Sequence, residues 1–312
     1  MRTRKTSLVR FYYYSNDTAW YTFSMSDSTI RKLPPSEFPP LLAEIPQPPE
    51  QLWLTGNLPP LDIALIAVVG SRKYTTYGKQ VVEHLIAGLA GYPVGIISGL
   101  ALGIDSLAHE AALEHNLYTM AVPGSGLDES VLYPPSHTRL ARRIVEMGGG
   151  LLSEFKPLMP AARWTFTQRN RIMAGMCRAT LLIEAAPASG TLITARMAVD
   201  YNRELLVVPG SIFSHTSYGT HQFLKLGATP VTEAADILAV LGIPVRDTIE
   251  TKHRPPLSPL ETLVLSHLVN PTDRDSLFRL LPLPTSEAGV LLMQMEMQGY
   301  ITIEGNQYRT II

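Results

Sequence analysis

Short apolar runs alternate with helix-length segments through the middle of this chain, and this alternation restricts the possible folds more than any other feature. Within Thr75–Ala90, for example, Val82, Leu85 and Leu89 recur at helical spacing. The expected strands are Ile63–Val69, Val94–Ser98, Tyr118–Val122, Thr180–Glu184 and Glu204–Val208, and the expected helices are Thr75–Ala90, Gly103–His115, Gly190–Tyr201 and Tyr218–Leu226. Strands that alternate with helices are typical of right-handed βαβ units, so the sequence predicts an α/β fold with a parallel sheet covered on both faces.

Proline clusters indicate where the expected sheet domain ends. Between Pro34 and Pro49, seven prolines remove backbone N–H donors and fix φ, which opposes regular structure. Before them, Phe11–Tyr14 and Trp20–Phe23 have strand-like composition. Three further prolines lie within residues 242–256, which we expect to form a linker.

The last part of the chain has a different pattern from the sheet region. Leu260, Leu263, Val264 and Leu268 form one helical face, Ser276–Leu281 a short second helix, and Val290, Met293 and Met297 mark a third. Tyr300–Ile303 and Gln307–Ile311 are expected strands around a turn at Glu304-Gly305-Asn306. Three helices followed by a hairpin predict a small C-terminal winged-helix domain over residues 257–312.

Composition excludes several classes of protein. With 46% apolar and 17% charged residues, the chain has enough apolar material for a large core and does not resemble a disordered protein. Its single cysteine, Cys177, excludes internal disulfides and a cysteine zinc cluster, and we expect no metal and no cofactor. The longest apolar stretches have strand length, and no apolar run follows the basic residues near the start. We therefore expect a soluble cytoplasmic protein with no membrane partner.

Four glycine-containing loops follow expected strands or open the helices after them. In a parallel sheet, ligands bind beyond the carboxyl ends of the strands, where loop amides and helix N-termini converge. The loops are Gly70-Ser71-Arg72, Ser98–Asp105, Pro123–Asp128 with Gly124 and Gly126, and Ser189-Gly190-Thr191. Glycines let the backbone approach a phosphate, and Arg72 can pair with phosphate oxygens in a bidentate geometry. Together the four loops predict one rim that faces a polyanion, although an ordinary set of strand-to-helix turns remains the alternative for each loop alone.

Asp105 and His109 are four residues apart on an expected helix, so they share one face and could form a hydrogen bond. A metal site would need a third ligand, and none is apparent nearby. We therefore interpret the two residues as a structural pair and assign no catalytic role to either.

Positive charge is concentrated between Arg139 and Arg178. This stretch has eight basic residues and two acidic ones, within a chain whose net charge is −1. Trp164 and Phe166 lie inside it, beside Arg169-Asn170-Arg171. Single-stranded nucleic acid is bound by cations that contact phosphates and by aromatic rings that stack on unpaired bases. A buried pair of rings beside solvated arginines is the alternative, and the residues alone leave both interpretations open.

These motifs together resemble one family, the bacterial DNA-processing proteins DprA/Smf. The similarity is collinear from Phe38 to Leu241. The matching segments are Phe38–Leu42, Val69–Arg72, Ser98–Ala101, Gly103–Asp105, Ala108-His109, Gly124–Asp128, Tyr133-Pro134, Leu152–Glu154, Gln168–Ile172, Ala174-Gly175, Glu184-Ala185, Ser189–Ala195 and Val208–Gly210. The resemblance places the sheet domain at residues 38–241 and leaves residues 1–37 as a short N-terminal aromatic segment with a Pro-rich lead.

The resemblance implies an extended Rossmann-like domain that binds single-stranded DNA and forms a homodimer. In this family the protein protects incoming DNA and loads RecA recombinase during natural transformation, displacing single-strand-binding protein. The residues implied to contact DNA are Gly70, Ser71, Arg72, Gly124, Gly126, Phe166, Arg169, Asn170, Arg171, Ser189, Gly190 and Thr191. The winged-helix interpretation of the C-terminal region also fits the family, whereas the residues before the sheet are too few and too aromatic for us to expect in them the helical domain that many members carry there.

Two other functions share this type of fold. Nucleotide phosphoribohydrolases that resemble the LOG cytokinin-activating proteins need a carboxylate in a Gly-Thr-x-x-Glu sequence, and this chain has Thr194 at that position. A threonine hydroxyl is not ionised near neutral pH, so only Glu184 could substitute. A nucleotide sensor with the same fold is the second alternative. We expect no enzyme activity and no catalytic residue.

Overall fold

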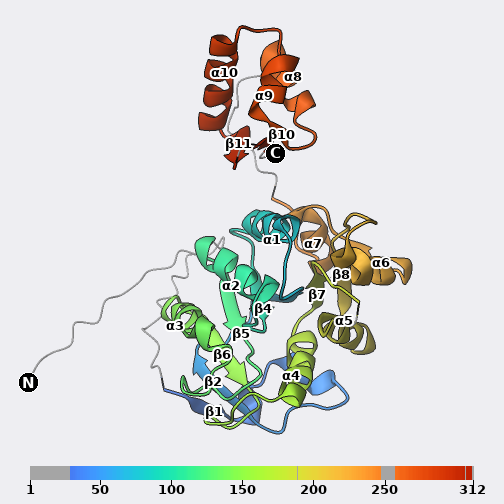
Figure 1. Cartoon of the computed structure of the whole chain (residues 1–312). Helices are drawn as coiled ribbons and strands as arrows, with labels where there is room; N and C mark the ends of the chain where they lie inside the picture. The colour runs from blue at the N-terminus through green and yellow to red at the C-terminus, as the bar shows by residue number, and fades with distance from the viewer. Residues whose placement is uncertain (1–28, 188, 247–256, 306, 311–312) are drawn as a thin grey trace, which may run out of the picture. The chain divides into compact units, whose positions relative to one another are not determined.

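The computed structural model describes residues 29–187, 189–246, 257–305 and 307–310. These residues form two compact units, which divide between Val245 and Arg246 (Figure 1). The aromatic stretches expected near the N-terminus, and most of the expected linker, lie outside the described residues.

The first unit is built on a nine-stranded sheet with the order β1-β2-β6-β5-β4-β3-β7-β8-β9. The strands are β1 Arg31–Leu33, β2 Leu52–Gly56, β3 Ala64–Val69, β4 Val94–Ser98, β5 Tyr118–Ala121, β6 Gly150–Ser153, β7 Ala179–Leu182, β8 Glu204–Val207 and β9 Thr229–Pro230. Strands β3 to β9 are parallel, and the sequence predicted β3, β4, β5, β7 and β8 among them but not β6 or β9. Strands β1 and β2 were not predicted and pair antiparallel at one edge, so the sheet is mixed.

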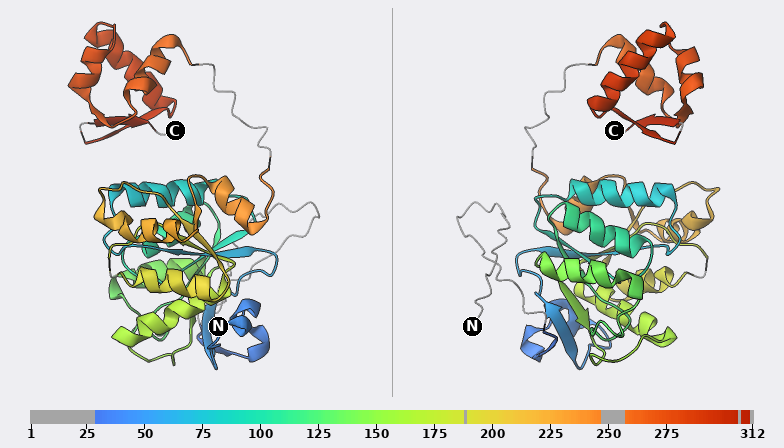
Figure 2. Two further views of the ribbon diagram at one scale, coloured as in Figure 1. Left: turned by 90° about the vertical axis from the view of Figure 1, so that its right-hand side faces the viewer. Right: turned by 60° about the vertical axis from the view of Figure 1, so that its left-hand side comes forward.

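Helices cover both faces of this sheet, as the views in Figure 2 show. They are α1 Thr76–Gly88, α2 Ile104–Glu114, α3 Thr138–Glu146, α4 Arg163–Met176, α5 Thr191–Asp200, α6 Tyr218–Lys225 and α7 Ala234–Leu241, with short 3-10 turns at Pro35–Glu37, Pro40–Glu44, Pro135–His137 and His215–Ser217. Helices α1, α2 and α7 pack on one face, and α4, α5 and α6 pack on the other.

Side chains of the central strand β3 alternate between two cores. Leu65, Ala67 and Val69 belong to the core beneath α4 and α5, whereas Ile66 and Val68 belong to the core beneath α1 and α2. Successive side chains of a strand point to opposite faces, so a strand buried on both sides is apolar throughout. This explains why the apolar runs identify the central strands.

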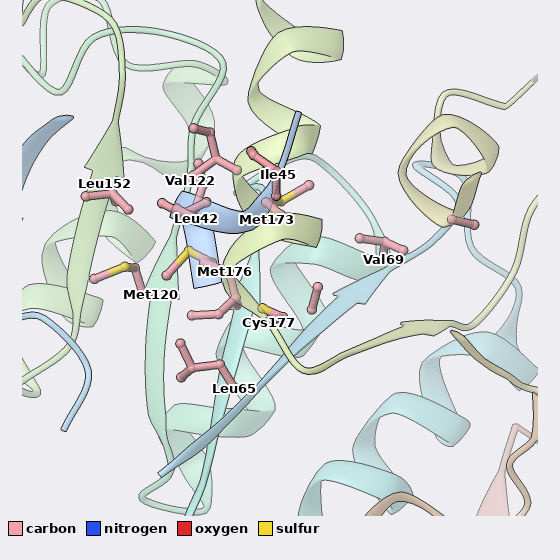
Figure 3. Close-up of a cluster of buried hydrophobic side chains, with 14 of the residues drawn as sticks. Leu42, Ile45, Leu65, Val69, Met120, Val122, Leu152, Met173, Met176 and Cys177 are labelled. Atoms are coloured by element: carbon pink, nitrogen blue, oxygen red, sulfur yellow. The ribbon is translucent and has the colours of Figure 1, made fainter. Parts of the chain in front are cut away.

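The Pro-rich segment folds against α4 instead of forming an irregular lead. Its two 3-10 turns place Leu42 and Ile45 in the core beside Met173 and Met176 of α4 (Figure 3). Strand β1 precedes these turns and pairs with β2. The sheet therefore begins at β1, ahead of the boundary expected at residue 38.

The second unit contains the three helices and the hairpin expected from the sequence. Its elements are α8 Pro259–His267, β10 Thr272–Asp273, α9 Arg274–Leu280, α10 Thr285–Met297, β11 Ile301–Glu304 and β12 Gln307–Thr310. Val264, Leu277 and Leu292 meet in its core. The short strand β10, which pairs with β12, was not predicted. Asn306 of the expected turn lies outside the described residues, and the winged-helix assignment stays a prediction.

Among the described residues, no helix combines the length and the apolar character that a membrane span requires.

Candidate functional site

A cavity of about 710 Å³ lies at the carboxyl ends of β3 and β7. Strands β4 to β6 extend the sheet on one side of β3, and β7 to β9 extend it on the other. The chain therefore reverses its direction of winding between β3 and β7, which is where open α/β sheets bind ligands. The lining includes Gly70, Ser71, Arg72, Lys73, Ala101, Asp105, Phe166, Thr167, Arg169, Asn170, Ser189, Gly190, Thr191, His215 and Thr216. We call this space the switch-point cavity.

Three of the four predicted loops meet at this cavity, and hydrogen bonds join them. The hydroxyl of Thr191 donates to the carbonyl of Gly70 over 3.0 Å, and the amide of Ile104 donates to the carbonyl of Ser71 over 3.1 Å. Gly103 has a φ of +89°, and a Cβ there would overlap the backbone of Ser71 and Arg72. The rim is therefore one connected backbone surface.

Phe166 forms the aromatic wall of the cavity. The guanidinium carbon of Arg72 lies 5.4 Å from the centre of the Phe166 ring, within the range of a cation–π contact. Tyr133 packs edge-on against the same ring, with centroids 5.4 Å apart. Gly124 makes room for the ring, since a Cβ there would lie 2.5 Å from Cδ1 of Phe166. The glycine loop after β5 thus supports Phe166 and does not itself line the cavity.

Arg169 is a buried cation in the floor of the cavity, with only 4% of its surface exposed. Its guanidinium donates to the carbonyl of Val122, and its Nε has no partner among the described residues. Burial lowers the pKa of Arg169 to about 10, so it stays protonated at neutral pH. Gly99 is required beside it, because a Cβ there would overlap the guanidinium.

Asp105 is the carboxylate that lines the cavity opposite Arg169. It accepts hydrogen bonds from the amides of Gly99, at 3.1 Å, and Ala101, at 3.4 Å. Burial raises the pKa of Asp105, and the charge of Arg169 lowers it in part. The carboxylate therefore fixes the loop after β4 and offsets the buried charge of Arg169.

Asp105 and His109 do not act as the predicted pair. His109 is fully buried, and its Nδ1 hydrogen-bonds the hydroxyl of Thr119 over 2.7 Å, whereas Asp105 bonds to backbone amides. Both residues lie on one face of α2, but the sheet provides His109 with a different partner.

Glu184, which follows β7, joins two sides of the cavity rim without lining it. Its carboxylate accepts hydrogen bonds from the amide and hydroxyl of Thr75 and from the hydroxyl of Thr216. Thr75 caps α1 directly after the Arg72 loop, and Thr216 lines the cavity from the loop after β8. The Glu184 side chain is therefore used to position the rim.

Arg171 and Gly126, for which the resemblance implies DNA contact, do not line the switch-point cavity. Arg171 forms a buried ion pair with Glu154 and donates to the carbonyl of Gln47 in the Pro-rich segment. Gly126 packs against the backbone of Lys156 and Pro157, where a Cβ would overlap carbonyl oxygens. Both residues therefore contact other parts of the fold and not the switch-point cavity.

The other residues of the basic stretch are dispersed. Arg142 pairs with Glu129 on the exposed side of α3. Trp164 is 53% exposed and packs edge-on against Phe155, while Phe166 alone of the two rings lines the cavity. Of the eight basic residues between Arg139 and Arg178, only Arg169 lines the cavity, so the charge of this stretch is larger than its contribution to the cavity.

Sequence reasoning did not assign five polar residues that line the cavity: Lys73, Thr167, Thr194, His215 and Thr216. Lys73 directly follows the predicted Arg72 loop. His215 and Thr216 belong to the loop after β8, which also ends at this edge of the sheet. The same rule that selected the other loops would have selected this one.

Comparisons with known proteins identify the family of this chain. The model of the family described as DNA recombination-mediator protein A matches residues 31–242. Escherichia coli Smf is 43% identical over 204 residues, which cover 65% of this chain and 54% of that protein. Streptococcus pneumoniae DNA processing protein DprA is 42% identical over 198 residues, which cover 64% of this chain and 69% of that protein. The chain thus spans about half the length of the first relative.

Two solved structures have the same fold. DNA processing protein A from Streptococcus pneumoniae superimposes with a TM-score of 0.64 at 39% identity, covering 67% of this chain and 74% of that one. The protein from Helicobacter pylori, whose structure concerns its single-stranded DNA binding mode, gives a TM-score of 0.61 at 28% identity, covering 68% and 95%. The chain belongs to the DNA recombination-mediator protein A family, that is, to the DprA/Smf proteins.

Proposed function

We propose that this chain binds single-stranded DNA in the switch-point cavity. The observation that carries the proposal is the position of Arg72 over the ring of Phe166, at the mouth of a cavity whose floor holds the buried cation Arg169. The Phe166 ring can stack on a base, and the positive charges of Arg72 and Arg169 beside it can attract phosphates. The Helicobacter pylori relative, which binds single-stranded DNA, supports the same ligand.

The phosphate backbone lies along the joined loops in this mechanism. Gly190, beside which a Cβ would meet no atom, and the neighbouring amides allow close approach, while Arg72 and Lys73 supply exposed positive charge. Arg169 attracts the strand from below without leaving its hydrogen bond to Val122. These contacts address the sugar-phosphate chain, so binding is expected to be largely independent of base sequence.

Duplex DNA fits this cavity less well. Its bases are paired and stacked on one another, so none is free to stack on Phe166 without the cost of unpairing. Preference for a single strand is therefore the expected signature of the site.

The wider role that we propose is protection of incoming DNA and loading of RecA onto it during natural transformation, with displacement of single-strand-binding protein. Family membership supports this role. A homodimer would place two cavities on one strand and increase its affinity by avidity.

A phosphoribohydrolase has less support from the site. The Glu184 carboxylate already accepts three hydrogen bonds from Thr75 and Thr216, and it does not line the cavity. Asp105 lines the cavity, but its carboxylate bonds the Gly99 and Ala101 amides and faces Arg169. We therefore propose a binding protein and not an enzyme.

The test is fluorescence-anisotropy binding of labelled oligo-dT and of a matched duplex at several salt concentrations. The wild type is expected to bind the single strand more tightly, and Arg72→Ala to weaken that binding. Lys32→Ala is the matched control, since it removes one exposed positive charge from the edge strand β1, five strands away from β3. Equal binding of both DNA forms, or equal effects of both variants, would overturn the proposal, and hydrolysis of nucleoside monophosphates would then be measured.

A further inference from the structure

The loop after β8 displays an exposed aromatic side chain that the proposed site does not use. Phe213 is 93% exposed and its neighbour Ile212 is 79% exposed. The other exposed aromatic side chains among the described residues, including Trp164, are at most 53% exposed. Apolar side chains so open to water commonly mark a binding surface when they adjoin a site.

Hydrogen bonds hold this loop in place at both its base and its tip. The Tyr77 hydroxyl donates to the carbonyl of Pro209 over 2.7 Å, and Nε2 of His221 lies 3.0 Å from the carbonyl of Gly210. At the tip, the amide of Phe213 donates to the hydroxyl of Ser211 over 3.2 Å. The exposure of Phe213 is thus part of an ordered turn.

The loop leads directly into the switch-point cavity. His215 and Thr216 line the cavity, and Thr216 is held by Glu184, which also holds Thr75 beyond the Arg72 loop. Two residues of extended chain span at most about 7 Å, so Phe213 stands within that distance of His215, measured between Cα atoms. A single strand of DNA that leaves the cavity past His215 would therefore reach Phe213 next.

The charge of the segment suits a polyanion. From Pro209 to Gln222 there is no aspartate or glutamate, and His215 is exposed. An exposed apolar tip, in a segment that contributes no acidic residue and continues into a cavity lined by cations, matches the alternation of rings and positive charge that single strands require.

We propose that Phe213 is a second base-stacking position, on which the strand of DNA stacks a base after it leaves the cavity. This inference rests on the proposed function, because it extends the same strand beyond Phe166. It predicts a footprint that covers the cavity and continues along the loop after β8. A contact between two copies of the protein at this loop is the competing explanation, and the test separates the two.

The experiment compares Phe213→Ala, Phe213→Trp and wild type in anisotropy binding to oligo-dT of about 4 and about 12 nucleotides, lengths within the range of known single-strand sites. Phe213→Ala is expected to bind the longer strand about tenfold more weakly and the shorter strand unchanged, while Phe213→Trp retains binding of both. Leu61→Ala is the matched control, because Leu61 is 96% exposed but precedes β3 at the opposite end of the strands.

Each other outcome overturns the inference in a recognisable way. Equal binding by Phe213→Ala and wild type at both lengths removes the stacking role. An equal loss at both lengths places the effect inside the cavity or on the fold. A change in sedimentation mass of Phe213→Ala without DNA identifies a contact between protein copies. If the wild type binds neither strand, or Arg72→Ala has no effect, the proposed function itself fails, and this inference fails with it.

Discussion

Arg169 and Arg171 are two residues apart on α4, but the guanidinium of Arg169 lines the switch-point cavity and that of Arg171 forms an ion pair with Glu154. Residues two apart on an α-helix project about 200° from each other. Arg169 therefore reaches the switch-point cavity, while Arg171 is paired with Glu154 and tied to Gln47 in the Pro-rich segment. Of these two arginines, Arg169 lines the cavity and Arg171 stabilises the packing of α4 against the Pro-rich segment.

The first prediction follows from the buried ion pair. Arg171→Ala leaves Glu154, whose side chain is 9% exposed, without its cation, so the free energy of unfolding should fall by about 3 kcal/mol. Urea denaturation measures this loss. The double variant Arg171→Met with Glu154→Leu should recover part of it, because no unpaired charge remains. Affinity of the folded Arg171→Ala protein for oligo-dT should change less than twofold, and a large loss of affinity with normal stability would place Arg171 at the DNA after all.

The second prediction concerns salt. Three cations line the cavity, Arg72, Lys73 and Arg169. With about three phosphates neutralised, the logarithm of the binding constant for a single strand should fall with the logarithm of salt concentration with a slope near −2, at roughly −0.7 for each contact. Arg72→Ala should make the slope shallower by about 0.7, whereas Lys32→Ala should leave it unchanged. An unaltered slope for Arg72→Ala would mean that this guanidinium contacts no phosphate.

The third prediction uses a glycine that supports Phe166. In Gly124→Ala the new Cβ would lie 2.5 Å from Cδ1 of Phe166, so the ring must move from the cavity wall. Affinity for oligo-dT should fall by about 1 kcal/mol or more, the range for loss of one stacked base. Phe166→Ala should show a similar loss, and the double variant should lose little more than either alone. Additive losses would contradict an effect of Gly124 through the ring.

The fourth prediction concerns a glycine with empty space beside it. Gly190 lines the cavity at the start of α5, and a Cβ there meets no atom within 4 Å. Gly190→Ala should therefore leave the melting temperature unchanged or slightly raised, because a φ of −59° suits alanine and the substitution lowers the conformational entropy of the unfolded chain. If a phosphate approaches this backbone, the same methyl group should weaken oligo-dT binding several-fold. Unchanged binding would show that the strand does not approach Gly190.

The central sheet and most of the cavity could be predicted from the sequence, for a physical reason. Buried parallel strands are apolar throughout, and ligand loops follow their carboxyl ends, so Ile66 and Arg72 are found by composition and position alone. The face of α4 that turns to the cavity depends on packing against the Pro-rich segment, which spacing does not reveal. Spacing alone therefore could not show that Arg171 pairs with Glu154 while Arg169 lines the cavity.

The last prediction concerns His109, which is fully buried on α2. The hydroxyl of Thr119 donates to the carbonyl of Ile96, so it accepts a hydrogen bond from Nδ1 of His109, and Nδ1 carries a proton. Burial lowers the pKa of His109 to about 3, below its ordinary value of 6.5. Between these two values the unfolded chain binds a proton that the folded chain does not, so stability falls as pH falls from 6.5 toward 3.

The contribution of His109 to this loss can be isolated by substitution. Between about pH 7.5 and pH 5.5 it should amount to about 1.4 kcal/mol, which corresponds to one pKa unit. Urea denaturation at both pH values measures the total change in the free energy of unfolding. In His109→Asn, which retains a donor toward Thr119 but does not titrate, the change should be smaller by that amount. The same pH dependence in both proteins would assign the loss to other groups and contradict a neutral, buried imidazole at this position.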